Sequence, residues 1–295
     1  QVVRHQGVTS SPKSLACGVP QGTKLGPILF LALVNDAALT STYRWKYVDD
    51  LSLVEVLPKT RQSSLQEYVD ELGEWCAIND VTPKPEKCKA MQVSFLKNPL
   101  PQLDITIADV HLERVDSLTL LGVAIQSDLK WDNQVQQMIS RAARRLYILS
   151  VLKKSGVNAN DLVTIYKAYI RPLMEFGVPV WGSGITNTQS DKIERIQRRA
   201  LRFIVYPADL SYTQRLTRFN MPMLCERRND LLLRFGRGLL KSERHRDMLP
   251  ATRQCVSHRS STLRSAHLLD LQRCKTQRYR NSTIPFLTRM LNFSK

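Results

Sequence analysis

Two adjacent carboxylates, Asp49 and Asp50, are the side chains of this 295-residue chain best suited to bind a metal ion. They lie within residues 43–54, YRWKYVDDLSLV, a run without Gly or Pro in which Trp45 and Tyr47 would share one face of a strand. Neighbouring carboxylates repel each other unless cations hold them, and oxygen ligands of this kind suit Mg²⁺. We therefore predict a tight hairpin with both acids at its tip and a Mg²⁺ site there. The alternative is an ordinary solvated turn.

A loop that leads into a helix is the second candidate. Gly18, Pro20 and Gly22 interrupt regular structure, and Gly26-Pro27 then opens a helix, because proline is tolerated in the first turn. The free backbone N–H groups of such a junction suit a phosphate, and Gln21 adds a neutral donor and acceptor beside them. A Gly/Pro turn before a buried helix explains the same residues equally well.

Two predicted helices carry arginine-rich faces. One starts at a cap on Asp132, and the other runs over 191–206 behind a cap on Ser190. Like charges on one helix face repel each other unless phosphates or the acids of a partner balance them. We therefore predict contacts to a nucleic-acid backbone, with a solvated helix face as the alternative. The residues concerned are Arg141 and Arg144 on the first helix, and Arg195, Arg198, Arg199 and Arg202 on the second.

Hydrophobic periodicity predicts the elements that position these residues. An amphipathic helix over 61–79, with a capping box of Ser64 and Glu67, contributes apolar core and no chemistry. From Trp131 onward the period is helical, and Pro172 is expected to kink a helix over 161–176. Strands are predicted over 91–95 and, as a small antiparallel meander, over 103–107, 110–115 and 117–125.

Net charge separates the two halves of the chain. Residues 1–130 hold 13 Lys and Arg against 15 Asp and Glu, whereas residues 131–295 hold 30 against 11. A strongly basic half indicates a polyanionic partner, and nucleic acid is the leading candidate. No apolar run approaches the roughly 18 residues of a membrane span. Without a signal-peptide pattern or a membrane segment, we expect an intracellular protein of the nucleus or cytoplasm.

Two of these motifs, in this order, resemble a known enzyme family. The run GVPQGTKLGP at 18–27, followed by YVDD at 47–50, looks like the palm of a reverse transcriptase, and most closely that of retrotransposons without long terminal repeats, of the jockey or LINE kind. Residues 147–157, 169–176, 193–202 and 278–285 resemble the downstream part of such polymerases. The resemblance implies an α+β fold. It comprises a partial polymerase palm over 1–130 (an antiparallel sheet with helices on one face), an all-helical thumb over 131–243 and a basic C-terminal tail over 244–295.

The resemblance also implies roles for the two motifs. Asp49 would bind the catalytic metals, with Asp50 supporting it, and Tyr47 would lie near the primer end. The Pro20-Gln21-Gly22 loop, together with Tyr47, would line the pocket for the incoming nucleotide and the template.

Two further predicted sites rest on the resemblance alone. Lys87 best matches a lysine that is proposed to protonate the leaving pyrophosphate, although a lysine on a loop is commonly just solvated. Leu121 and Gly122 resemble the primer-grip hairpin, in which a glycine within a strand suits close approach by another backbone. A packing role for Gly122 is equally compatible with the sequence.

The implied reaction is nucleotidyl transfer from a dNTP to the 3′-hydroxyl of a DNA primer on an RNA template, assisted by two Mg²⁺ ions. The resembling family supplies a further Asp from a strand upstream of the Gln21 loop, and this chain begins too late to contain it. We therefore expect a C-terminal polymerase fragment, beginning inside the palm, that is inactive alone. A non-catalytic nucleic-acid-binding remnant is one alternative, and a scaffold for an acidic protein is another.

Overall fold

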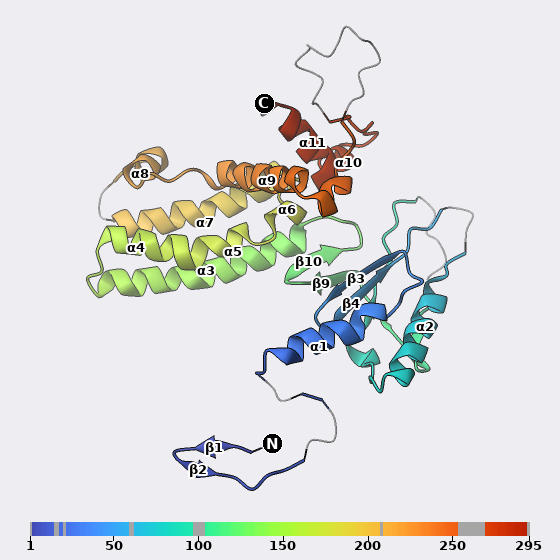
Figure 1. Cartoon of the computed structure of the whole chain (residues 1–295). Helices are drawn as coiled ribbons and strands as arrows, with labels where there is room; N and C mark the ends of the chain where they lie inside the picture. Colours follow the sequence, from blue (N-terminus) through green and yellow to red (C-terminus); the bar gives the residue numbers. More distant parts are fainter. Residues whose placement is uncertain are drawn as a thin grey trace. The chain divides into compact units, whose positions relative to one another are not determined.

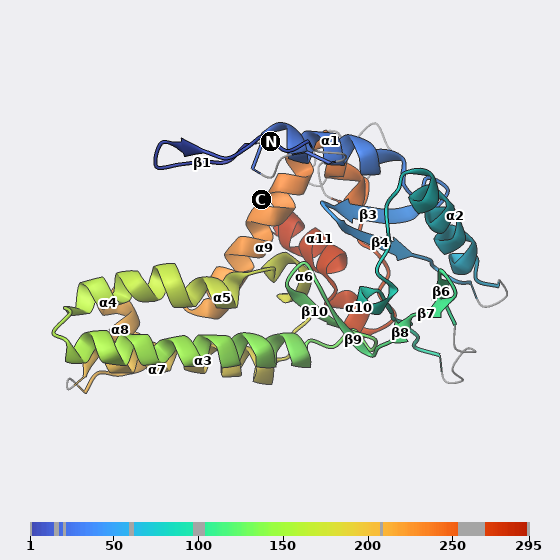
Figure 2. The ribbon, with the colours of Figure 1, turned by 90° about the horizontal axis from the view of Figure 1, so that it is seen from below.

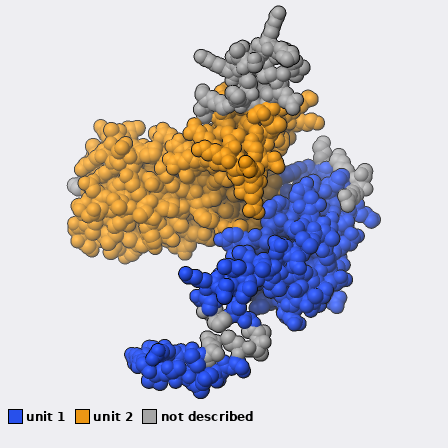
Figure 3. Space-filling view, in the orientation of Figure 1, with its two compact units in different colours: residues 1–116 blue, residues 117–295 orange. Residues whose placement is uncertain are grey.

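The computed structural model describes residues 2–14, 18–19, 22–58, 62–96, 104–206, 209–252 and 269–293. The chain forms two compact units, residues 1–116 and residues 117–295 (Figures 1 and 3). Two predicted site residues, Pro20 and Gln21, lie outside the described residues, as does part of the predicted tail. The division into palm, thumb and tail is functional and stays a prediction.

The first unit contains two α-helices and short strands. Helix α1 (Leu25–Leu33) forms where the Gly26-Pro27 signal predicted a helix, yet none of its residues is buried. Neither α1 nor any other helix in the described part of the chain is long and apolar enough to cross a bilayer. The remaining elements of the unit are β1 (Arg4–His5), β2 (Val8–Thr9), the 3-10 turn η1 (Val34–Asp36), β3 (Tyr43–Tyr47), β4 (Asp50–Val54), α2 (Leu65–Ile78), the 3-10 turn η2 (Pro85–Lys87), β5 (Lys89–Ala90), β6 (Thr106–Ile107), β7 (Val110–His111) and β8 (Glu113–Arg114).

The strands of the first unit pair two by two. The pairs β1–β2, β3–β4 and β6–β7 are antiparallel, whereas β5 and β8 are parallel. The predicted meander is confirmed only where residues 106–107 pair antiparallel with residues 110–111; residues 110–115 divide between β7 and β8, and β8 pairs with β5 instead. The separate strand predicted over 91–95 does not form. A two-residue parallel pair joins segments far apart in the chain, so local alternation of apolar residues could not reveal it.

Helix α2 is amphipathic as predicted, and its buried residues are Val69 and Cys76. The predicted capping box does not form, because the Ser64 side chain makes no cap hydrogen bond. Glu55, just beyond β4, instead accepts hydrogen bonds from Ser63 Oγ at 2.6 Å and from the Ser64 N–H at 3.0 Å. The carboxylate that binds the N–H at this helix start therefore comes from the residue after β4 and not from Glu67 within the helix.

The second unit is predominantly helical. A capping box of Thr186 and Gln189 starts α7, so the predicted cap at Ser190 is wrong, and Asp132 is the first residue of α3 and not its cap. The elements are β9 (Ser117–Leu120), β10 (Val123–Gln126), α3 (Asp132–Lys154), α4 (Ala159–Ile165), the π-helical turn η3 (Tyr166–Ile170), α5 (Arg171–Glu175), α6 (Val178–Trp181), α7 (Asn187–Val205), α8 (Tyr212–Arg218), α9 (Leu224–Lys241), the 3-10 turn η4 (Glu243–Met248), α10 (Gln277–Arg280) and α11 (Thr283–Phe293). Near Pro172, where a kink was predicted, the helix contains a π-helical turn that ends at Ile170.

Helix α3 is the element against which α4, α5 and α7 pack (Figure 2). Gln189 Nε2 donates to Asp132 Oδ1 at 2.7 Å where α3 and α7 both begin. Where both end, Lys153 Nζ donates to the carbonyls of Phe203 at 2.6 Å and Ile204 at 3.1 Å. The two helices therefore run parallel, and Lys153 satisfies carbonyls that the last turn of α7 leaves without internal donors.

One continuous apolar core joins the elements of the second unit, from Val123 on β10 to Leu291 on α11. Trp181 is fully buried, and its Nε1 donates to the carbonyl of Phe176 at 2.8 Å. Tyr166 is also fully buried, and its hydroxyl donates to Gln197 Oε1 at 2.9 Å. Both polar tips have partners, as large amphipathic side chains in a core require.

Candidate active site and nucleic-acid interface

The acidic pair lies at the end of the β3–β4 hairpin, as predicted. A two-residue connection, Val48-Asp49, joins the strands, and Asp50 is the first residue of β4, opposite Tyr47. Both acids are exposed. Val48 has a φ of 54°, a left-handed conformation that is rare for a β-branched residue and costs about 1–3 kcal/mol. Backbone strain of this kind clusters at functional sites, which makes the turn a candidate site.

The aromatic face of β3 is open to solvent. Trp45 and Tyr47 share that face, as predicted, and their side chains are 56% and 63% exposed. Tyr43 lies on the same face and stacks on Trp45, with ring centroids 6.3 Å apart. These rings are exposed on the strand that leads to the acids and form no part of a core.

The opposite face of β3 carries two cations that the sequence pattern did not single out. Lys46 Nζ donates to the carbonyls of Val34 at 2.7 Å and Asn35 at 2.9 Å. Burial lowers the pKa of Lys46, and the nearby Arg44 lowers it further, while Asp36 acts in the opposite direction. The sequence signal that could have found them is the alternation of cations with aromatic residues along this strand. Successive side chains of a strand point to opposite faces, so both cations lie on the face opposite the exposed rings.

Two other acids of the first unit, Asp36 and Asp70, have partners on α2. Trp75 Nε1 donates to Asp36 Oδ1 at 3.0 Å, and Gln66 Nε2 donates to Asp70 Oδ1 at 2.6 Å. Among the described residues, no group of three or more His, Cys, Asp and Glu side chains is arranged to hold a metal ion. The donor chemistry of Asp49 and Asp50 nevertheless suits Mg²⁺, which is commonly held by one or two carboxylates together with substrate phosphates and water.

The remaining predicted residues lie on separate elements. Gly22 is exposed with a φ of 84°, shortly before α1. Lys87 is exposed at the end of η2, and within the described ranges no hydrogen bond or ion pair joins it to the acids. Leu121 and Gly122 form the turn of the β9–β10 hairpin, with φ values of 46° and 82°. Gly122 is therefore not inside a strand, and a Cβ there would lie 3.1 Å from the Phe176 ring and not against another backbone.

The predicted arginines are all exposed. On α7 they occupy the face opposite the buried residues Ile193, Ala200 and Ile204. Arg198 lies over the ring of Tyr212 at 5.0 Å, and Arg199 lies over that of Phe203 at 5.4 Å. In the part of the chain that the structure describes, no acid forms an ion pair with Arg141, Arg144, Arg195, Arg198, Arg199 or Arg202. Their charges are available to phosphates.

Glu194 does not neutralise the arginine face of α7, although the sequence placed it nearby. It is buried, and one carboxylate oxygen accepts a hydrogen bond from the Leu224 N–H at 2.9 Å, at the first turn of α9. The Tyr212 hydroxyl also donates to Glu194. Burial and this hydrogen bond raise the pKa of Tyr212 well above its usual value. Glu194 thus caps a helix, and its distant partners could not be recognised from local sequence.

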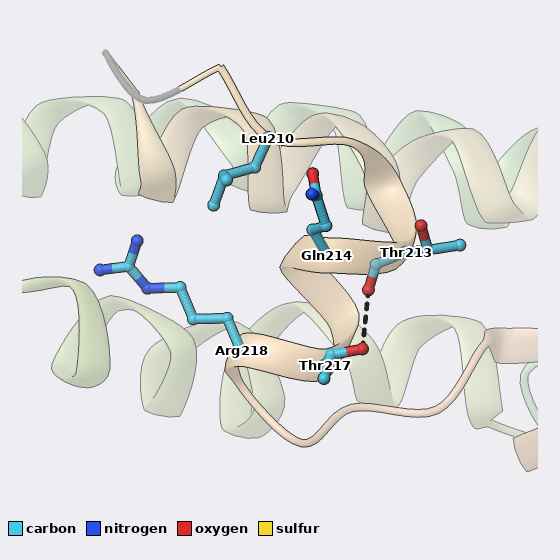
Figure 4. Close-up of a pocket in the computed structure, with 5 residues that line it drawn as sticks. All are labelled: Leu210, Thr213, Gln214, Thr217 and Arg218. Atoms are coloured by element: carbon cyan, nitrogen blue, oxygen red, sulfur yellow. Dashed lines mark hydrogen bonds between the residues drawn. The ribbon is translucent and has the colours of Figure 1, made fainter.

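An open hollow of about 460 Å³ lies beside α8 (Figure 4). Thr217 Oγ1 donates to the carbonyl of Thr213 at 3.1 Å on its wall. The other lining residues are Leu210, Gln214 and Arg218. None of the predicted site residues lines it.

Comparisons with known proteins show which protein family this sequence resembles. Residues 2–125 match the family described as reverse transcriptase (RNA-dependent DNA polymerase). The chain is 24% identical over 218 residues to the probable RNA-directed DNA polymerase from transposon BS of Drosophila melanogaster, a match that covers 69% of this chain and 24% of the relative. It is 26% identical over 224 residues to the RNA-directed DNA polymerase from mobile element jockey of the same species, a match that covers 68% of this chain and 23% of the relative. No solved structure matches the chain.

The matches locate the similarity within the chain. The span 2–125 contains both the loop before α1 and the acidic hairpin, while the matches to relatives cover about two-thirds of the chain. The chain spans about a quarter of the length of these relatives. The predicted resemblance is therefore confirmed: residues 2–125 match the reverse transcriptase family, and the chain is similar to the RNA-directed DNA polymerases of jockey-like, non-LTR mobile elements.

Proposed function

We propose that this chain is part of an RNA-directed DNA polymerase in which Asp49 and Asp50 bind Mg²⁺. The observation that carries the proposal is the strained, solvent-exposed hairpin turn that presents both acids within the span matching the family. When bound, the metal ions would activate a primer 3′-hydroxyl and stabilise the leaving oxygen of a dNTP. The substrates would be a dNTP, a DNA primer and an RNA template, as the family resemblance implies.

The neighbouring residues would position these substrates. Tyr47 is exposed opposite Asp50 and would lie near the primer end. Gly22 turns the chain into α1 with a φ that favours glycine, so the N–H groups of the loop could face a triphosphate. Lys87, also exposed, would donate a proton to the leaving pyrophosphate. Leu121 and Gly122, at a hairpin turn, would contact the primer.

The second unit would bind the nucleic-acid backbone and serve as the thumb. Its exposed arginines on α3 and α7 have no ion-pair partners among the described residues, and residues 131–295 carry a large excess of positive charge. Phosphates neutralise such a face and release counterions when they bind. Because its substrates are nucleic acids, we place the protein in the nucleus or cytoplasm.

We also propose that the chain alone does not extend a primer. Two-metal transfer requires a clamp on both the attacking and the leaving oxygen, and among the described residues no third His, Cys, Asp or Glu side chain joins Asp49 and Asp50 in a metal-binding group. Primer extension on an RNA template with Mg²⁺ tests this, and we expect no extension. Extension that Asp49→Ala abolishes would refute the claim of inactivity but support the role of Asp49. Extension that Asp49→Ala leaves intact would refute that role.

Nucleic-acid binding is tested separately. The double variant Arg198→Glu/Arg202→Glu should weaken binding of an RNA–DNA hybrid at least about tenfold, and should lower the slope of log affinity against log salt by about 2. Fluorescence anisotropy over a range of salt concentrations measures both quantities. The matched control is Arg234→Glu/Arg237→Glu, which makes the same charge change at exposed positions of α9.

Equal losses in the two double variants would show that total charge, and not the α7 face, determines binding.

A non-catalytic remnant is the second candidate function, favoured by the small number of described acids at the hairpin. In that case Asp49→Ala would have no effect on Mg²⁺ binding, while the α7 variant would still lose nucleic acid.

A further inference from the structure

Lys46 directly precedes the Tyr47-Val48-Asp49-Asp50 turn and holds the end of α1. Its ammonium donates to the consecutive carbonyls of Val34 and Asn35, which follow the last residue of the helix. The Val34 carbonyl also accepts a long hydrogen bond from the Ala37 N–H at 3.3 Å. Carbonyls at a helix end carry partial negative charge, so an ammonium there is favourable. Hydrogen bonds from a charged donor are also stronger than neutral ones.

Arg44, two residues before Lys46 on the same face of β3, also binds backbone carbonyls of the preceding segment. Its Nη1 donates to the carbonyls of Leu39 and Ser41, both at 2.8 Å. From the other side, α2 binds the same segment, because Trp75 Nε1 donates to Asp36 Oδ1 at 3.0 Å. The connection 34–41 between α1 and β3 is therefore fixed by polar contacts from the hairpin and from α2.

Apolar packing contributes little to the placement of the hairpin. On its covered face Leu51 and Leu53 are half-buried, and no residue of β3 or β4 is buried. The turn itself is strained at Val48. A strained conformation persists only where its surroundings hold it, and here the nearest such contact is that of Lys46.

Helix α1 connects this contact to the loop predicted to receive the nucleotide. It begins at Leu25, shortly after Gly22, and ends at Leu33, next to the two carbonyls that Lys46 binds. A helix of nine residues is a rod about 13 Å long. The ammonium of Lys46 thus ties one end of the rod to the acidic turn, while the other end carries the loop.

We infer that Lys46 is a positioning residue: its ammonium fixes the Asp49-Asp50 turn against the end of α1 and thereby sets the acids relative to the Gly22 loop. The inference rests on the proposed function, since the acids must bind a metal ion for their position to matter. Lys46 itself touches neither metal nor substrate and acts through the backbone of the turn.

Two measurements on the full chain test the inference, with Mn²⁺ as the probe for the metal site. Amide hydrogen exchange reports the order of β3 and β4, and Mn²⁺-induced broadening of the Asp49 and Asp50 amide signals reports metal binding. Lys46→Met should speed exchange in the hairpin about tenfold, as loss of charge-assisted hydrogen bonds implies. It should also require several-fold more Mn²⁺ for the same broadening.

Two further variants serve as controls. Lys46→Arg keeps a charged donor and should restore both properties. Lys84→Met removes an exposed ammonium from the same unit and should change neither.

The outcomes separate the inference from the proposed function. If Lys46→Met loosens the hairpin but leaves Mn²⁺ broadening unchanged, or if Lys84→Met has the same effects, Lys46 is not a positioning residue. If Asp49→Asn leaves the broadening unchanged, the acids do not bind the metal, and the proposed function fails whatever Lys46→Met does. If Asp49→Asn abolishes broadening, Lys46→Met weakens it and Lys46→Arg restores it, both stand.

Discussion

The two units of the molecule are stabilised in different ways. Among the described residues of the first unit, the buried apolar side chains are few and mostly small: Ala37, Ala38, Val69, Cys76 and Ile105. The second unit has a continuous core that contains large residues such as Trp181, Tyr166 and Leu146. Conversely, the apolar helix α1 of the first unit leaves Leu25, Ile28 and Leu31 more than half exposed.

This difference also separates the two sets of candidate site residues. The acidic hairpin belongs to the unit held largely by polar contacts, such as those of Lys46 and Arg44, whereas the arginine face of α7 is carried by the unit with the core. Segments with few buried apolar contacts open at low free-energy cost, while core helices open only on global unfolding. We therefore expect the second unit to unfold cooperatively and the hairpin to open more readily.

The largest expected effect follows from removal of the central indole of the second unit. Trp181→Ala should destabilise that unit by about 3–5 kcal/mol, because it leaves a large cavity and removes the hydrogen bond to Phe176. Urea unfolding followed by far-UV circular dichroism measures the loss. Hydrogen exchange in β3 and β4 should not change.

The matched control is Tyr147→Ala, an aromatic truncation at a position of α3 that is 72% exposed, with an expected cost below about 0.5 kcal/mol. If Trp181→Ala sped exchange in β3 and β4 as strongly as in α3, the two units would unfold together. The contrast between them would then not hold.

A smaller effect is expected at alkaline pH, again in the second unit. Burial, together with the neighbouring Tyr212, raises the pKa of Tyr166 well above its usual value, and burial and Glu194 do the same for Tyr212. Tyrosines in the unfolded chain ionise near pH 10, so the stability that depends on their neutral form is complete below that pH and is lost as pH rises above it. Each tyrosine should raise the unfolding equilibrium constant by up to about tenfold per pH unit.

Urea midpoints of the helical signal at about pH 9 and about pH 11 measure this loss. The variant Tyr166→Phe/Tyr212→Phe should flatten the pH dependence while it lowers stability at neutral pH through lost hydrogen bonds. Burial lowers the pKa of Lys153, which stabilises the fold as pH rises in the same range, and the double variant leaves that contribution in place. An unchanged pH dependence in the variant would exclude the tyrosines as its source.

Features that depend on neighbours in sequence were predictable. The hairpin around Asp49, the helix after Gly26-Pro27 and the exposed arginines of α7 follow from alternation, helix signals and charge spacing, and the structure confirms them. The family resemblance rested on the same local motifs and is confirmed over residues 2–125. Local rules located these helices and strands, although the predicted caps at Ser64, Asp132 and Ser190 were wrong.

Features that depend on distant partners were not predictable. Glu55 at the start of α2, Glu194 at the start of α9 and the parallel pair β5–β8 each join segments that no periodicity relates. The same holds for Lys46, whose partners lie on the preceding helix end. Exposure is the usual state of charged residues, and their burial with a partner is visible only in three dimensions.

The smallest expected effect compares one substitution in both units. Val135→Ala removes two methyl groups from the core beneath α3, and Val69→Ala removes the same groups from α2. Each buried methyl or methylene group is worth about 0.8 kcal/mol, and a rigid core adds the cost of the cavity. We expect a loss of about 2 kcal/mol at Val135 and about 1 kcal/mol at Val69, since the sparser first unit can close around the gap. Hydrogen exchange of the slowest amides measures both losses, in α3 for the Val135 variant and in α2 for the Val69 variant. Equal losses would mean that α2 is packed as rigidly as α3, and that the small number of buried residues in the first unit does not weaken its packing.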